Sequence, residues 1–99
     1  MKRANVTEDG WRSFIELCTS ARNPKDLQEL FELFFTLEEK EAMGLRYLLI
    51  KALLAEKRTQ REISTDLKIS ISKITRGSNA LKTIHNRLKE ALKAHMLGQ

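Results

Sequence analysis

One segment of the sequence concentrates side chains that could bind a charged or aromatic partner. It reads ISKITRGSNALK over residues 71–82, and it combines hydroxyl groups and lysines with Arg76, which directly precedes Gly77. The surrounding pattern predicts a helix, and a glycine in a helix interior costs roughly 0.5–1 kcal/mol relative to alanine. The glycine therefore indicates that DNA, a small molecule or another helix comes close to this backbone.

The sequence offers little for catalysis. His85 and His95 are far apart, and no spacing of carboxylates, cysteines or glycines matches a metal site, an activated nucleophile or a phosphate loop. The single cysteine, Cys18, cannot form an internal disulfide, and its spacing places it on the apolar face of a helix. We expect no enzyme, no metal and no catalytic residue, with surface histidines and a buried, inert thiol.

The composition predicts a small all-α domain. The chain has 99 residues, of which 41% are hydrophobic and 31% charged, with four glycines and one proline. This composition favours helices joined by short turns, and a chain of this length buries only part of its surface, which favours oligomerisation. The first residues lack a signal peptide, and the richest apolar run, residues 45–54, is too short to span a bilayer. We therefore expect a cytoplasmic protein.

Positive charge is concentrated in the second half of the chain. Residues 57–99 carry ten Lys/Arg against three Asp/Glu, a net +7, whereas residues 1–56 carry eight against ten, a net −2. This imbalance favours a polyanionic partner for the second half. Basic side chains that only solvate helix surfaces would give the same composition, and the basic segment at 87–97 could instead lie on an anionic membrane.

Apolar spacing and capping signals predict six helices. Capping boxes that begin at Thr36 and Thr59 open a long central helix and the helix after it. The centre of the long helix is apolar nearly all round, as in the core of a dimer. We expect helices at about 7–21, 37–57, 60–67, 71–82 and 85–97, and a short one after Pro24. The corresponding parts are a flexible arm at 1–7, a helical dimerisation core at 8–57, a two-helix head at 58–83 and a C-terminal helix at 84–99 that closes the dimer core.

A break in helical spacing predicts two helices joined by a tight turn. Ile63, Leu67, Ile69 and Ile74 are spaced four, two and five apart, and a pair two apart cannot share one helix face. The chain must therefore turn beside Ile69, with Ser70 placed to cap the second helix. This is the spacing of a helix-turn-helix, whose second helix would present hydroxyls and a lysine to the major groove. An ordinary αα-hairpin is the alternative.

The segment TQREISTDLKISISKITRGSNALK, together with the upstream LEEKEAMGLR, closely resembles the tryptophan repressor family over about residues 10–95. The resemblance implies an all-α, intertwined six-helix homodimer with a helix-turn-helix DNA-binding head. It also implies a repressor of tryptophan metabolism genes that binds L-tryptophan as co-repressor, with no other cofactor, and then a two-fold symmetric operator. The implied partners are double-stranded operator DNA, L-tryptophan and a second copy of the chain, with no membrane.

The resemblance assigns a ligand site and a DNA surface to numbered residues. The indole would lie between two arginines, one of which binds the ligand carboxylate, with a glycine leaving room for the ring. Carbonyls at the end of the partner chain's second helix would hold the amino group. The implied ligand-binding residues are Leu33, Phe35, Thr36, Arg46, Arg76, Gly77 and Ala80. The implied DNA-binding residues are Gln60, Arg61, Ser70, Ile71, Ser72, Lys73, Thr75 and Lys82, of which the first two and the last resemble phosphate anchors.

Four positions depart from the family pattern. Ala80 stands where familiar members have a serine that bonds the ligand, Lys68 and Ser70 replace turn glycines, and Ser64 replaces a DNA-contacting lysine. A lysine with positive φ would carry modest strain. The departure at Ala80 leaves open a relative that binds DNA constitutively or answers another indole or metabolite. A sensor that binds an indole but acts through a protein partner is a further alternative.

Overall fold

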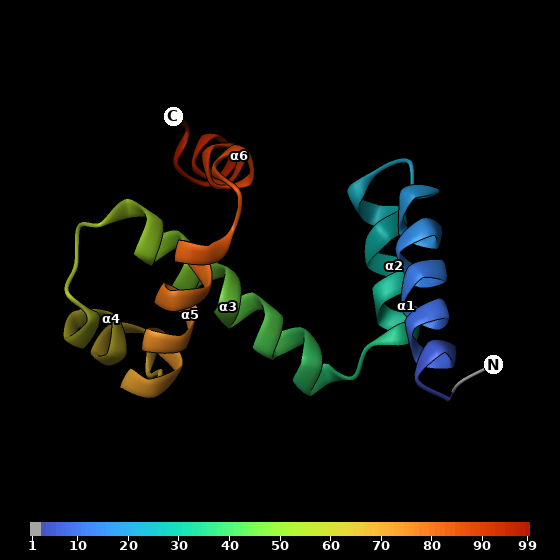
Figure 1. The fold of residues 1–99 in the computed structure, drawn as a ribbon, viewed down its shortest axis with the longest axis horizontal. Coiled ribbons are helices and arrows are strands. Elements are labelled where there is room, and N and C mark those ends of the chain that lie inside the picture. Colours follow the sequence, from blue (N-terminus) through green and yellow to red (C-terminus); the bar gives the residue numbers. More distant parts are fainter. Residues whose placement is uncertain (1–2) are drawn as a thin grey trace. The chain divides into compact units, whose positions relative to one another are not determined.

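Over residues 3–99, which the computed structural model describes, the chain forms helices joined by short turns and contains no strand (Figure 1). This confirms the all-α prediction. The helices are α1 (Arg3–Thr19), α2 (Pro24–Phe34), α3 (Leu37–Ala55), α4 (Gln60–Leu67), α5 (Ile71–Thr83) and α6 (Asn86–Leu97). The four helices from α3 onward begin and end within about two residues of the bounds expected from the sequence.

The first helix differs from its expected bounds at both ends. It begins at Arg3, so it overlaps the arm expected at 1–7, and the two residues before Arg3 lie outside the described part. It ends at Thr19, before the Asn23-Pro24 signal, where the Thr19 and Ser20 hydroxyls donate to carbonyls three residues back, each at 2.6 Å. Asn23 caps α2 instead, because its side chain accepts from the Asp26 N–H at 2.9 Å.

The capping box expected at Thr59 is present at the start of α4. The Thr59 hydroxyl accepts from the Glu62 N–H at 3.1 Å, and the Glu62 carboxylate accepts from the Thr59 N–H at 2.9 Å. Hydrogen bonding of the Glu62 carboxylate to Thr59, to its backbone N–H first and to its side chain second, holds the pKa of the Glu62 carboxyl below its ordinary value. The start of α4 is therefore closely defined.

The chain divides into two compact units, and the first of them, up to Leu37, is a helical hairpin. Its two helices, α1 and α2, lie side by side (Figure 1), and Phe14 of α1 contacts aromatic rings of α2. The Phe14 ring lies between 5.1 and 6.1 Å, centroid to centroid, from four other aromatic rings, those of Trp11, Phe31, Phe34 and Phe35. Nevertheless no residue of α2 is fully buried, and Trp11 remains 58% exposed. The hairpin therefore leaves a large apolar surface uncovered within the described chain.

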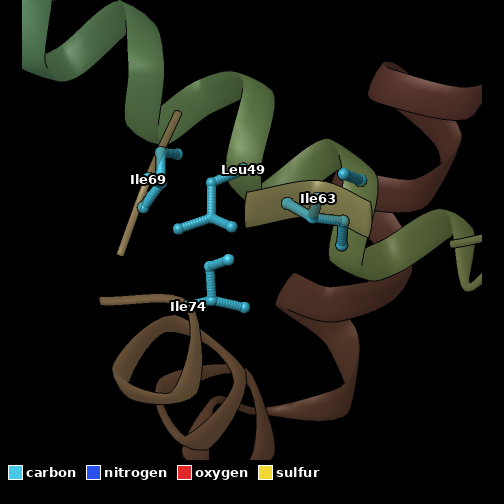
Figure 2. Packing of buried hydrophobic residues seen from close by; sticks show 5 residues of the cluster. Leu49, Ile63, Ile69 and Ile74 are labelled. Atoms are coloured by element: carbon cyan, nitrogen blue, oxygen red, sulfur yellow. The ribbon is translucent and has the colours of Figure 1, made fainter. Parts of the chain in front are cut away.

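The second unit, from Glu38 to the C-terminus, holds the buried core. Ile63 of α4 and Ile74 of α5 are 1% and 0% exposed, and Figure 2 shows them converging with Leu49 of α3 and Ile69 of the turn. The core consists of Leu49, Ala52, Ile63, Ile69 and Ile74, with Leu53 and Leu67 packed against it. The predicted packing of α4 on α5 through their isoleucines is thus confirmed, and α3 forms the third side of the core.

The turn between α4 and α5 combines strain with an internal tether. Lys68 adopts a left-handed conformation with φ of 55°, which confirms the expected strain, since side chains with a Cβ disfavour this region. The Ser64 carbonyl accepts from the Ile69 N–H at 3.3 Å, and the Ser64 hydroxyl donates to the Ile69 carbonyl at 2.6 Å. Ser64 therefore holds both polar groups of Ile69 where the helices cross.

Candidate functional site

The N-terminal part of α5 is exposed along one side because the other side is buried. Ile74 is fully buried, and Gly77, Ser78 and Leu81, which follow at spacings of three and four, are half-buried. The remaining side chains of the first two turns face solvent, and Ile71 among them is 47% exposed. The exposed residues there are Ser70, Ile71, Ser72, Lys73 and Thr75, which are the central members of the expected DNA-binding set.

The beginning of α5 is arranged by its capping serine. The Ser70 hydroxyl oxygen accepts from the Lys73 N–H at 3.3 Å, which confirms the expected cap. The Ser70 and Ser72 hydroxyl oxygens also lie 3.2 Å apart, within hydrogen-bond distance. Two hydroxyls therefore sit at a helix N-terminus, where the partial positive charge of the helix favours an anionic group.

Residues from the start of α4 lie beside this face. The Thr75 hydroxyl makes a long contact of 3.5 Å to the Gln60 side-chain oxygen, so the first residue of α4 reaches the second turn of α5. The neighbouring Arg61 is exposed. Lys82 is also exposed but lies near the opposite end of α5. The structure thus brings the start of α4 to the exposed face of α5 and separates Lys82 from the residues of that face by about two turns.

The expected ligand residues fall in two groups. Arg46 on α3 and Arg76 on α5 belong to the second unit, and both side chains are exposed, as is Ala80 one turn after Arg76. The carbonyl-bearing residues Leu33, Phe35 and Thr36 lie at the end of α2 in the first unit. The assignment of tryptophan to these residues therefore stays a prediction.

Gly77 has a neighbour that explains its lack of a side chain. A Cβ atom built on Gly77 would lie 3.3 Å from Leu49 Cδ2 and 3.5 Å from Leu53 Cδ1, both on α3. Of the three neighbours considered for this glycine, the structure identifies another helix. Arg76, which precedes it, is turned to solvent. The close approach of α5 to α3 therefore accounts for the glycine without a ligand, and a ligand contact at Gly77 remains a prediction.

The role of Ser64 was not anticipated from the sequence. The resemblance marked it only as the replacement of a DNA-contacting lysine, whereas its hydroxyl donates to the Ile69 carbonyl within the turn. The replacement of the turn glycine by Lys68 is the one sequence signal for this, because a strained turn gains from an added tether. At the expected surface positions His85 and His95 are exposed, whereas Cys18 is half-buried rather than buried.

No helix between residues 3 and 99 is long and apolar enough to cross a membrane. In the same part of the chain, no three histidine, cysteine, aspartate or glutamate side chains are grouped so that they could hold a metal ion.

Comparison with known proteins gives a consistent family. The family model described as Trp repressor protein matches residues 9–96. A Trp operon repressor homolog of Chlamydia caviae is 50% identical over 86 residues, covering 87% of this chain and 85% of the relative. A homolog with the same description from Chlamydia trachomatis serovar D is 46% identical over 88 residues, covering 89% and 94%. One from Mannheimia succiniciproducens is 41% identical over 85 residues, covering 86% and 84%.

The contact between Gly77 and α3 predicts the effect of adding a methyl group there. Gly77→Ala is expected to lower the free energy of unfolding by about 1 kcal/mol, because overpacking costs roughly 1–3 kcal/mol and better helix propensity returns roughly 0.5–1 kcal/mol. The matched control is Gly10→Ala in α1, where a Cβ meets nothing within 4 Å and the same change should stabilise. Urea denaturation measures both.

A double-mutant cycle identifies the contact responsible. Leu49→Val removes the δ-carbons that face Gly77, so the cost of Gly77→Ala should fall in that background. If Gly77→Ala stabilises the protein as Gly10→Ala does, the explanation by helix packing is wrong.

Proposed function

This chain belongs to the Trp repressor family, and we propose that it is a transcriptional repressor which binds L-tryptophan as co-repressor and then a two-fold symmetric operator. In this proposal it acts in the cytoplasm on genes of tryptophan metabolism. It is a regulator and not an enzyme, in line with its family. The observation that carries the proposal is the exposed N-terminal face of α5, held outward by the burial of Ile74.

The α4–turn–α5 segment, residues 60–83, is proposed as a helix-turn-helix reading head. A helix fits the width of the major groove, Ile71 can contact a thymine methyl, and Lys73 and the serine hydroxyls can bond to base edges or phosphates. Gln60 and Arg61 at the start of α4, and Lys82 near the end of α5, are proposed to contact phosphates. Their positions at the two ends of the helix pair suit a backbone that crosses the reading head.

The proposed active form is an intertwined homodimer. Trp11 and Leu33 are 58% and 77% exposed on the first unit, and Leu45, Tyr47 and Leu48 of α3 are exposed on the second. Apolar surface on this scale is rarely left in water and marks an interaction surface. A two-fold dimer would cover it and would place two copies of α5 at successive major grooves about one helical turn apart.

The ligand site is proposed to form between chains. Arg46 and Arg76 carry planar guanidinium groups that can stack on an indole, and Arg76 can bind a carboxylate through charge-assisted hydrogen bonds. The end of the partner's α2 supplies carbonyls that suit an ammonium group. Because Arg76 lies on α5, tryptophan held there would set the position of α5. A differential affinity of 1–3 kcal/mol would then strengthen DNA binding roughly 5- to 150-fold.

The second candidate is a relative that binds DNA constitutively or in response to another indole or metabolite. It is favoured by Ala80, which is exposed one turn after Arg76 and has no hydroxyl to offer a ligand. The loss of one hydrogen bond costs about 0.5–1.5 kcal/mol, so tryptophan affinity would fall by up to about tenfold.

Calorimetric titration with L-tryptophan tests the co-repressor. The wild type should release heat on binding, and Arg76→Ala should weaken binding roughly 10- to 150-fold, since a hydrogen bond to a charged group contributes about 1.5–3 kcal/mol. Arg87→Ala, an exposed arginine on α6, is the control and should bind as the wild type does. If the wild type gives no heat at millimolar tryptophan, the second candidate replaces the first.

Two lysine variants test whether the exposed face at the start of α5, here called the reading face, contacts the bases. The binding target is a DNA duplex that the tryptophan-bound wild type selects from a random library. Lys73→Ala should change which operator variants are preferred, since base contacts are worth roughly 1–3 kcal/mol each. Lys82→Ala should weaken binding to all variants alike and reduce the slope of log affinity against log salt by about one. Equal, uniform losses for both would show that the reading face is misplaced. A wild type with no salt-dependent binding to any duplex would favour a sensor that acts through protein.

A further inference from the structure

A second basic site lies away from the reading face, in a pocket formed by α3, α5 and α6. The pocket has a volume of about 120 Å³, and its polar lining consists of Glu56, Ser78, Lys82, Lys89 and Lys93. The rest of its wall is leucine from α3 and α5. Neither Lys89 nor Lys93 belongs to the DNA-binding set proposed above.

The pocket gathers more positive than negative charge. Lys89 and Lys93 are four residues apart and so lie on the same face of α6, while Lys82 comes from α5. Glu56 is the one acidic residue in the lining, which leaves a net charge of about +2. Glu90 approaches Lys93 at 3.9 Å, but it is 62% exposed and lies outside the lining. Like charges gathered around one pocket repel one another, and a bound anion would relieve the repulsion.

The surroundings strengthen attraction to an anion. The Lys93 side chain is only 29% exposed, and the leucines of the same lining lower the effective dielectric constant within the pocket. Ser78 adds a residue with a hydroxyl donor to the three lysines of the lining. A volume of about 120 Å³ is several times what one water needs and is enough for the oxygens of one phosphate group.

We propose that this pocket binds a phosphodiester group of DNA and so extends the DNA contact from α5 onto α6. The inference rests on the proposed function, because Lys82 and Ser78 stand on the helix that this function places against DNA. A free phosphate has the same chemistry, and the experiment separates the two sources. Lysine stems that only pack against leucines would give the same geometry without any phosphate.

The test is the salt dependence of binding to the selected duplex. Lys89→Gln/Lys93→Gln should reduce the slope of log affinity against log salt by about one per protomer and weaken binding to all operator variants alike. Lys25→Gln/Lys40→Gln removes the same charge from exposed positions on α2 and α3 and should leave the slope near that of the wild type. Lys89→Arg/Lys93→Arg keeps the charge, so the slope should stay near that of the wild type. A role of the two lysines in packing alone would not require the slope to be kept.

Circular dichroism checks the fold of each variant. If the glutamine pair loses helix content, Lys89→Gln and Lys93→Gln are measured singly, and each must still lower the slope. An unchanged slope in folded variants overturns this proposal and leaves the proposed function standing. A slope reduced equally by the control pair overturns it as well, because net charge would then explain the effect.

Inorganic phosphate separates the two sources of the anion. It is titrated into the labelled wild type while the amide resonances of Ser78 and Lys89 are followed by NMR. If phosphate shifts both resonances but the glutamine pair leaves the duplex slope unchanged, the pocket holds a free anion and the assignment to DNA is wrong. If the wild type binds no duplex at all, the proposed function and this inference fall together.

Discussion

The burial of Ile74 between α3 and α4 is the interaction on which the rest of the second unit depends. Ile74 is 0% exposed, packed with Ile63 and Leu49, and no other residue of α5 is fully buried. Because a helix turns every 3.6 residues, this one contact turns the adjacent side chains of Lys73 and Thr75 toward solvent. It also determines that Gly77, three residues later, meets α3. The face proposed to read DNA and the close approach to α3 are therefore consequences of the same packed side chain.

Much of the second unit was predictable from the sequence because its signals are local. Leu67 and Ile69 are two residues apart and cannot share one helix face, so their spacing predicted both the turn and the core residues on either side of it. The neighbour of Gly77 was not predictable, since Leu49 lies far away in sequence and only the packing of α5 on α3 brings them together. The Ser64 tether was missed for a related reason: its acceptor, the carbonyl of Ile69, becomes available only once Lys68 has entered the left-handed region.

The first unit leaves much of its apolar surface exposed in the single chain. Its aromatic cluster around Phe14 joins α1 to α2 but buries no residue of α2 fully. Two helices alone are too small to cover their own apolar faces. The expected ligand residues divide in the same way, with arginines on one unit and carbonyls on the other. The grouping of these arginines and carbonyls into one site follows from the resemblance alone, because spacing within one chain carries no information about contacts between chains. The proposed dimer would complete the core and the ligand site together.

The central claim is that α5 turns its exposed side to DNA while its buried side anchors it. Methyl NMR of the isoleucine-labelled protein, titrated with the selected duplex and L-tryptophan, tests this most directly because one helix carries both probe and control. The account predicts that the Ile71 methyl resonance shifts strongly on binding, while those of Ile63 and Ile74 change little. Binding that leaves Ile71 unchanged, with shifts confined to Ile15 of α1, would contradict it.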